Sequence, residues 1–329
     1  MYAVVVLHTA SNLLFMYPKV AVGDWLAADF YNGLTRFGVP VFVMITGALL
    51  LNREYEPLSF AKKRIGRIIV PFLFWSVVYI IYKWYDQDIT FTHDAWANTV
   101  LVLQLLRDGS FYHLWYVYML IGLYLLIPIL SRFTRNAGEK ELLYFLALWF
   151  IAILIGRPYF TQFGSQIDLQ YFTGYVGYLV LGHYLAHKQI DLKNARLWFW
   201  LMFFVTLALI VLGTYLFSKH YQTISTLMYE PIGPAIVILS ASVFMLARLT
   251  PFKLSQRLTR LRDVISGSTF GIYLSHALIL AVLDNWLNIN SDMCNPFISI
   301  PVTALLCFVL SIALVWVLGK LPFGKWLTA

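Results

Sequence analysis

Apolar segments recur along the whole 329-residue chain and are separated by short polar loops. Most of them approach the ~20 residues that an α-helix needs to cross a hydrocarbon core about 30 Å thick. We therefore predict an all-α membrane protein with about ten transmembrane helices in one bundle, forming a single domain over residues 1–329. The predicted segments are 1–17, 31–51, 67–85, 113–131, 140–156, 171–187, 196–217, 231–248, 269–288 and 297–318.

Composition supports a membrane environment. Hydrophobic residues make up 60% of the chain and charged residues only 12%, whereas soluble domains have about 25% charged residues. The two cysteines do not indicate a disulfide framework. The sequence also has no paired cysteines and no HExxH motif, so we predict no metal site and no bound cofactor.

Lysine and arginine residues are distributed unequally between alternate loops. One set of loops carries 18 of them, whereas the other carries five: Lys19, Lys83, Arg107, Arg157 and Lys219. Because basic residues accumulate on the cytoplasmic side of membrane proteins, this asymmetry predicts that both termini are cytoplasmic. The net charge of +8 then reflects topology, and we predict no nucleic-acid partner.

His8 lies inside the first apolar segment, in the run MYAVVVLHTASNLLFMY. An ionisable side chain at membrane depth is costly and is therefore a functional-site candidate. The alternative is a packed histidine that a neighbouring helix satisfies. Asn12 follows one helical turn later and could orient the imidazole.

Arg64 and Arg67 lie in the basic run FAKKRIGRIIVPFLFW at residues 60–75. Residues three apart share one face of a helix. Two guanidinium groups on one face at the membrane surface suit a polyphosphate or nucleotide ligand. Contact with lipid phosphates is the alternative, and it is sufficient to explain the neighbouring Lys62 and Lys63.

Five further positions are candidates for a cavity or for support of the site. His113 and Trp115 open the fourth segment, where an aromatic belt at the membrane surface is the alternative. Tyr273 and His276 lie in the ninth segment and either form a structural cluster or line a polar cavity. Arg36 begins the run RFGVPVFVMITGALLL and either supports the site or reaches toward lipid phosphates.

Taken together, His8 and the runs RFGVPVFVMITGALL, FAKKRIGRIIVPFLFW, HLWYVYMLIGLYLL and FGIYLSHALIL resemble membrane acyltransferase family 3, in order and over nearly the whole chain. The chain most resembles bacterial surface-polysaccharide O-acetyltransferases, including the enterobacterial-common-antigen type. His8 matches the family's catalytic histidine, and Arg64 and Arg67 match an arginine pair linked to acyl-CoA use. The family's first helix also carries an arginine eleven positions before this histidine. That position would fall before Met1, so we expect the first helix to be truncated at its N-terminal end.

The resemblance implies a multi-pass O-acetyltransferase of the bacterial cytoplasmic (inner) membrane. It would take an acetyl group from cytoplasmic acetyl-CoA, a co-substrate, and pass it to a hydroxyl of a cell-surface or lipid-linked saccharide. A hydroxyl is a weak nucleophile and needs a base with a pKa near neutrality, which a histidine supplies.

The alternative function is that of a transporter or flippase of a lipid-linked saccharide. Transporters usually have repeated halves with broken helices in matching positions, and this sequence has no such symmetry.

Overall fold

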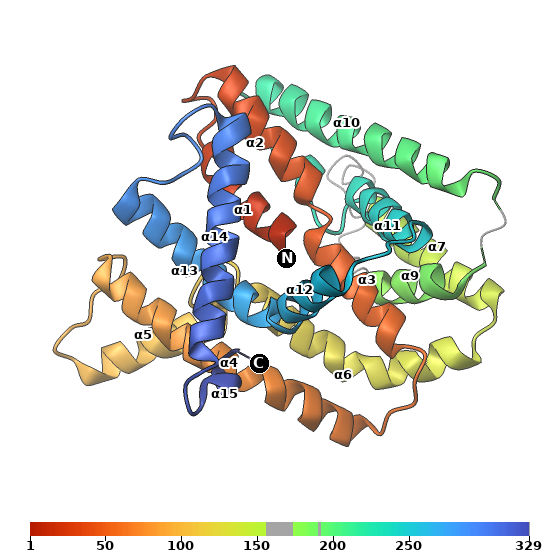
Figure 1. Cartoon of the computed structure of the whole chain (residues 1–329), viewed down its shortest axis with the longest axis horizontal. Helices are drawn as coiled ribbons and strands as arrows, with labels where there is room; N and C mark the ends of the chain where they lie inside the picture. The colour runs from red at the N-terminus through yellow and green to blue at the C-terminus, as the bar shows by residue number, and fades with distance from the viewer. Residues whose placement is uncertain (156–173, 190–191, 329) are drawn as a thin grey trace.

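The structure is a computed structural model that describes residues 1–155, 174–189 and 192–328. Its helices (Figure 1) are α1 (Tyr2–Leu14), α2 (Val22–Thr35), α3 (Gly38–Leu50), α4 (Pro57–Tyr85), α5 (Ala95–Asp108), α6 (Trp115–Asn136), α7 (Glu139–Ile155), α9 (Val176–His187), α10 (Ala195–Tyr221), α11 (Pro234–Leu249), α12 (Gln256–Gly267), α13 (Thr269–Leu287), α14 (Pro296–Leu318) and α15 (Gly324–Thr328). A short 3-10 turn, η2 (Leu227–Tyr229), precedes α11. The described residues contain no strand, so the predicted all-α fold is confirmed.

Seven helical stretches in the described residues are long and apolar enough to cross a membrane. They are Val22–Leu50, Pro57–Tyr85, Trp115–Asn136, Ala195–Tyr221, Leu227–Leu249, Thr269–Leu287 and Pro296–Leu318. Three other predicted segments contain shorter helices, namely α1 with 13 residues, α7 with 17 and α9 with 12. The prediction of an integral membrane protein is therefore confirmed, whereas ten complete membrane crossings stay a prediction. Residue 156, residues 171–173 and Arg157, which entered the predictions above, lie outside the described residues.

The second span is longer than predicted and is interrupted. Its first helix, α2, begins at Val22 rather than at residue 31, although Asp29 gives the stretch before residue 31 a polar, loop-like pattern. The side chains of Asp29 and of Asn32 are fully buried, so protein contacts replace the water that a loop would offer. Arg36 and Phe37 then separate α2 from α3.

Two further helices, α5 and α12, are not predicted by the apolar pattern, because neither helix buries a residue. Helix α5 lies at the edge of the molecule in Figure 1.

Glycines allow α3 and α9 to approach closely. A Cβ atom on Gly47 would lie 1.9 Å from the carbonyl oxygen of Leu179, and one on Gly182 would lie 2.1 Å from that of Met44. Small residues at helix crossings are typical of membrane bundles, where close van der Waals packing drives association. This crossing therefore depends on the absence of side chains at both positions.

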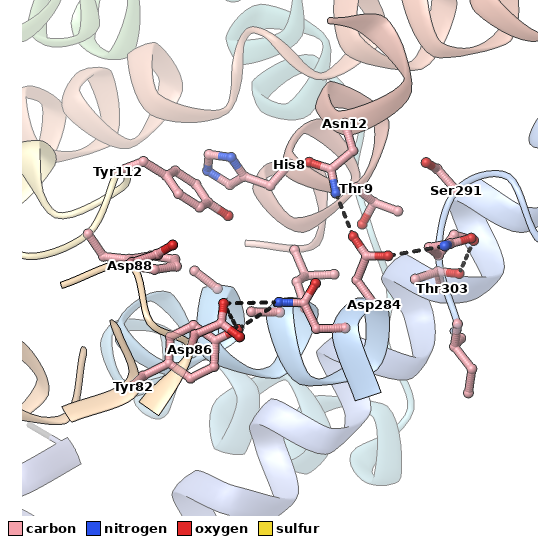
Figure 2. A pocket seen from close by; sticks show the side chains of 17 residues that line it. His8, Thr9, Asn12, Tyr82, Asp86, Asp88, Tyr112, Asp284, Ser291 and Thr303 are labelled. Atoms are coloured by element: carbon pink, nitrogen blue, oxygen red, sulfur yellow. Dashed lines mark hydrogen bonds between the residues drawn. The ribbon is translucent and has the colours of Figure 1, made fainter. Parts of the chain in front are cut away.

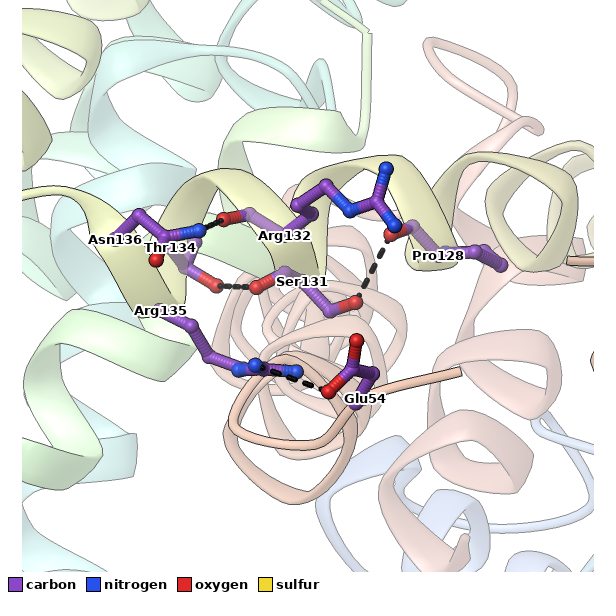
Figure 3. Close-up of polar contacts among 7 residues, drawn as sticks. All are labelled: Glu54, Pro128, Ser131, Arg132, Thr134, Arg135 and Asn136. Carbon is purple, nitrogen blue, oxygen red and sulfur yellow. Dashed lines mark hydrogen bonds and ion pairs between the residues drawn. The ribbon is translucent and has the colours of Figure 1, made fainter. Parts of the chain in front are cut away.

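Ion pairs join several of the basic loops at one end of the bundle. Arg135 at the end of α6 pairs with Glu54 in the connection after α3, at 3.3 Å (Figure 3). Three residues after α6, Glu139 begins α7 and pairs with Lys188, which follows α9. We call this end of the bundle, where α4 begins and α6 ends, the basic end. That the basic end faces the cytoplasm stays a prediction.

The opposite end of α4 carries acidic residues. From Arg67 to Asp86 the chain rises about 28 Å at 1.5 Å per helical residue, close to the thickness of a hydrocarbon core. There the amide nitrogen of Asn285, at the end of α13, donates to the Tyr82 hydroxyl at 2.9 Å. We call this end, with Asp86, Asp88 and Asp284, the acidic end.

Candidate functional site

Three histidines from distant parts of the sequence meet inside the bundle. The ring centroids of His8 on α1 and His276 on α13 lie 5.3 Å apart, and those of His113 and His276 lie 5.0 Å apart. His113 lies in the turn before α6, because that helix begins only at Trp115. His113 is 2% exposed and His276 is 0% exposed. The structure therefore brings together three residues that the sequence identified separately.

Two buried tyrosines fix the surroundings of this cluster. The Tyr79 hydroxyl on α4 donates to the carbonyl oxygen of Leu274 at 2.7 Å and accepts from the backbone nitrogen of Leu278 at 3.1 Å. The Tyr273 hydroxyl donates to the carbonyl oxygen of His113. These bonds connect α4, α13 and the turn before α6 around the histidine rings.

The hydrogen bonds of His276 determine where its lone pair lies. Its Nδ1 atom is 2.6 Å from the carbonyl oxygen of Tyr273. A carbonyl oxygen only accepts, so Nδ1 carries the hydrogen. In the neutral ring the lone pair is then on Nε2, which is buried and has no hydrogen-bond partner among the described residues. An unpartnered buried atom of this kind is rare.

His8 is the histidine of the cluster that lines a cavity. The cavity has a volume of about 220 Å³ and lies between α1, the end of α4, α13 and the connection to α14. Figure 2 shows His8 beside Tyr112 on one side of it, with ring centroids 5.0 Å apart. Within the described residues no hydrogen bond reaches the His8 ring. Its imidazole is thus open to a molecule in the cavity.

Three aspartates line the same cavity: Asp86 and Asp88 after α4, and Asp284 on α13. The sequence pattern does not predict any of the three as a site residue. A signal was nevertheless present, because Asp284 lies inside the predicted segment 269–288, and an ionisable residue inside a membrane segment is a functional candidate.

Asn12 contacts Asp284 rather than the His8 ring. Its Nδ2 atom donates to Asp284 Oδ2 at 3.0 Å, and Asn290 Nδ2 donates to Asp284 Oδ1 at 3.1 Å (Figure 2). The structure describes no hydrogen bond from Asn12 to the imidazole, because the amide nitrogen is bonded to Asp284. Asn12 lines the cavity, and it holds a carboxylate there.

Arg36 points into the protein and not toward lipid. Its Nε atom donates to Asn32 Oδ1 at 2.7 Å, and its guanidinium carbon lies 4.3 Å from the centroid of the Tyr229 ring. Asn32 in turn donates to the carbonyl oxygen of Leu7, the neighbour of His8, at 3.2 Å. Arg36 is thus linked through Asn32 to the backbone next to His8.

Trp115 does not lie on the cavity at His8. Its side chain is 42% exposed, and its ring packs 5.9 Å from that of Tyr175. Trp115 begins α6, two residues after His113, and successive helical residues point in directions about 100° apart. Closeness in the sequence therefore does not bring it to the cavity that His8 lines.

The arginine pair lies near the basic end of α4. Arg64 lines a second cavity of about 270 Å³ together with Arg53 and Tyr124. Arg67 is exposed and does not line this cavity. None of the ion pairs among the described residues involves Arg53, Arg64 or Arg67. Their charges are therefore available to an anionic ligand, and Arg53 is an addition that the sequence did not predict.

The two cavities lie at different heights along one helix. Tyr79 marks the level of the histidine cluster on α4, since its ring centroid is 5.2 Å from that of His113. From Arg67 to Tyr79 the helix rises about 18 Å. A ligand that contacts both arginines and the histidine cluster must therefore be long and narrow.

Comparison with known proteins gives the family. The model of an acyltransferase domain, that of acyltransferase family 3, matches residues 1–320. The chain belongs to acyltransferase family 3. The resemblance carried by the ordered motifs is thereby confirmed, and acyl transfer at a membrane is the chemistry associated with this domain.

Proteins similar to this chain have names that mention a polysaccharide. Two of them, from Staphylococcus aureus strains MRSA252 and MSSA476, are named probable poly-β-1,6-N-acetyl-D-glucosamine export proteins. Each is 21% identical to this chain over 344 residues, which cover 97% of this chain and 93% of the relative. No solved structure matches the chain.

Proposed function

We propose that this protein is an O-acetyltransferase of the bacterial inner membrane. It transfers an acetyl group from cytoplasmic acetyl-CoA to a hydroxyl of a cell-surface or lipid-linked saccharide. The observation that carries the proposal is the position of His8, which lines a polar cavity and has the buried His276 against its ring. Family membership supports acyl transfer, and the names of the relatives support a polysaccharide acceptor.

His8 acts as the general base. One nitrogen of its imidazole takes the proton of the acceptor hydroxyl while that oxygen attacks the thioester carbonyl carbon. The new carbon–oxygen bond forms, the carbon–sulfur bond breaks, and the sulfur of CoA leaves and takes up the proton that His8 received. The products are an acetyl ester and the free thiol of CoA, so the histidine returns to its starting state.

His276 positions the base. In the neutral ring its Nε2 lone pair can accept the N–H of His8, which leaves the other His8 nitrogen with the lone pair that catalysis needs. His276 itself is held through Nδ1 by the Tyr273 carbonyl oxygen. A base that a second group orients is a recurring arrangement in acyl transfer.

The basic end of α4 binds the donor. Arg64, Arg67 and Arg53 supply guanidinium groups for the phosphates of acetyl-CoA, and guanidinium forks recognise phosphate oxygens in pairs. The pantetheine arm then extends along α4 over the roughly 18 Å to the histidine cluster. Enclosure of the pantetheine arm within the bundle keeps bulk water from the thioester and so limits its hydrolysis.

Acetyl transfer by the purified protein tests the proposal. The protein in lipid nanodiscs receives acetyl-CoA with a labelled acetyl group together with N-acetylglucosamine oligosaccharides. We expect the label to appear as an ester on the saccharide, with one CoA thiol released per ester. Labelled acetyl-CoA that stays intact with every saccharide offered would contradict the proposal.

Saccharide export is the second candidate, and the names of the relatives favour it. The same protein in sealed vesicles distinguishes the two. Movement of an unacetylated saccharide across the membrane without any use of acetyl-CoA would support export. Dependence of saccharide modification on acetyl-CoA, with no such movement, supports the transferase.

A further inference from the structure

We infer that the cavity beside His8 selects a saccharide unit that carries no negative charge, and that Asp284 binds the hydroxyls of this unit. The inference rests on the proposed function, since that function makes this cavity the acceptor site. Three carboxylates line the cavity, whereas no lysine or arginine does so among the described residues. Apart from His8, the ionisable acids and bases that line this cavity are therefore all acidic.

The cavity has the features of a binding site besides its aspartates. Aromatic rings of Tyr82, Phe111 and Tyr112 form part of its wall and offer flat surfaces to the apolar faces of a sugar ring. Amides and hydroxyls of the connection between α13 and α14 complete it. The ring centroid of His276 lies 5.3 Å from that of His8, and the buried Nε2 atom of His276 has no partner among the described residues. An unpartnered buried polar atom next to a histidine that lines the cavity supports a functional role for this cavity.

Asp284 is held so that it can accept hydrogen bonds from a sugar. Each of its two carboxylate oxygens already accepts one amide, from Asn12 at 3.0 Å and from Asn290 at 3.1 Å. An ionised carboxylate has about four lone-pair positions, so each oxygen can accept one more donor. Saccharide hydroxyls are such donors, and bonds from them to a charged acceptor are strong.

The spacing of His8 and Asn12 along α1 suits one sugar unit. Asn12, which contacts Asp284, lies four residues or about 6 Å along α1 from His8. A single ring can therefore place one hydroxyl against Asp284 and present another to His8. The volume of about 220 Å³ is smaller than the roughly 300–1,000 Å³ of sites for drug-sized ligands, which also favours one unit of a chain.

The charge of that unit follows from the aspartates. A uronic acid would bring a fourth carboxylate into the cavity, where it would be repelled by the three aspartates. A neutral hexosamine donates hydroxyl hydrogens without this repulsion. An amino sugar with a free ammonium group is favoured further, because Asp86 and Asp88 are exposed at the rim and can pair with it.

Saccharide binding tests the inference without requiring catalysis. The protein in nanodiscs is titrated by calorimetry with matched oligosaccharides of N-acetylglucosamine, glucosamine and glucuronic acid. We expect the neutral and cationic chains to bind at least tenfold more tightly than the anionic one. Asp284→Asn should weaken binding of the neutral chain about tenfold, whereas Asp292→Asn, an exposed control in the same connection that does not line the cavity, should leave it unchanged.

A second variant keeps the test decisive if Asp284→Asn does not fold. The exposed pair is changed together, Asp86→Asn with Asp88→Asn, and the discrimination against glucuronic acid should fall several-fold. Equal binding of all three saccharides by the unmodified protein, or no effect of either variant, would overturn the inference. Charge selection without any acetyl transfer would refute the proposed function alone, and acetyl transfer without charge selection would refute only this inference.

Discussion

The rings of His8 and His276 lie 5.3 Å apart at an interplanar angle of 33°, although 268 residues separate them in the sequence. Only His8 lines the cavity, and only His276 is fully buried. The pair therefore combines a base that meets the acceptor with a second imidazole whose lone pair is shielded from water. This division of roles gives the two residues different expected phenotypes.

Removal of the His8 imidazole should abolish most turnover without loss of donor binding. A general base contributes about 10²–10⁴-fold, so His8→Ala should lower kcat for acetyl transfer by that factor while the Kd for acetyl-CoA stays the same. His220→Ala, a change of an exposed histidine at the end of α10, serves as the control. Normal turnover in His8→Ala would assign the chemistry to another residue.

Substitution of His276 should have a smaller effect that depends on the replacement. A typical hydrogen bond contributes about 0.5–1.5 kcal/mol, so His276→Ala should lower kcat about tenfold and leave the KM for acetyl-CoA unchanged. His276→Gln should recover part of this loss, because its amide oxygen can accept the His8 N–H. A purely structural role predicts instead that both variants lose thermal stability in parallel with activity, which unfolding curves of the same samples measure.

The arginine pair should control the donor affinity. Hydrogen bonds to charged groups contribute about 1.5–3 kcal/mol, so Arg64→Ala and Arg67→Ala should each raise the Kd for acetyl-CoA about 10- to 150-fold. Lysine at either position should recover this only in part, since it lacks the guanidinium fork. The neighbouring exposed Lys62 and Lys63 are matched controls, and equal effects of Lys63→Ala would favour general attraction to lipid phosphate.

The sequence predicts the helices and several site residues, but not how they meet. Long apolar runs locate the membrane helices, and the cost of ionisable groups at membrane depth identifies His8 and His276. Spacing along one helix cannot reveal contacts between helices far apart in the chain, so the approach of His8 and His113 to His276 is visible only in the structure. The sequence does not predict the surroundings of Asp29 and Asp284, because a carboxylate near the end of an apolar run looks the same whether it faces water or protein.

Close packing of α3 on α9 should make Gly47 intolerant of even a methyl group. In Gly47→Ala the new Cβ atom would lie 1.9 Å from the Leu179 carbonyl oxygen, so the two backbones must separate. Overpacking of this kind costs about 1–3 kcal/mol or more. Gly122→Ala in α6 is the control, because nothing lies within 4 Å of its added Cβ. Thermal unfolding in detergent should show a lower Tm for the first variant only, and equal Tm values would contradict the close crossing.

The native cysteines allow the orientation of the bundle to be tested. Cys294 is exposed in the connection between α13 and α14, close to Ser291 on the cavity, whereas Cys307 is buried. If the basic end is cytoplasmic, a membrane-impermeant maleimide should label intact cells through Cys294, and Cys294→Ser should abolish the labelling. In the Cys294→Ser background, a cysteine placed in the connection between α11 and α12 by Lys253→Cys should react only after the cells are permeabilised.

The opposite labelling pattern would have a chemical consequence as well as a topological one. Reaction of Cys294 only after permeabilisation would place the His8 cavity on the cytoplasmic side and the arginine pair on the outer side. Acetyl-CoA would then have no access to the cations proposed to bind it, because the donor is confined to the cytoplasm. The labelling experiment therefore tests whether donor and acceptor can approach the histidine cluster from opposite sides of the membrane, as transfer to a cell-surface saccharide requires.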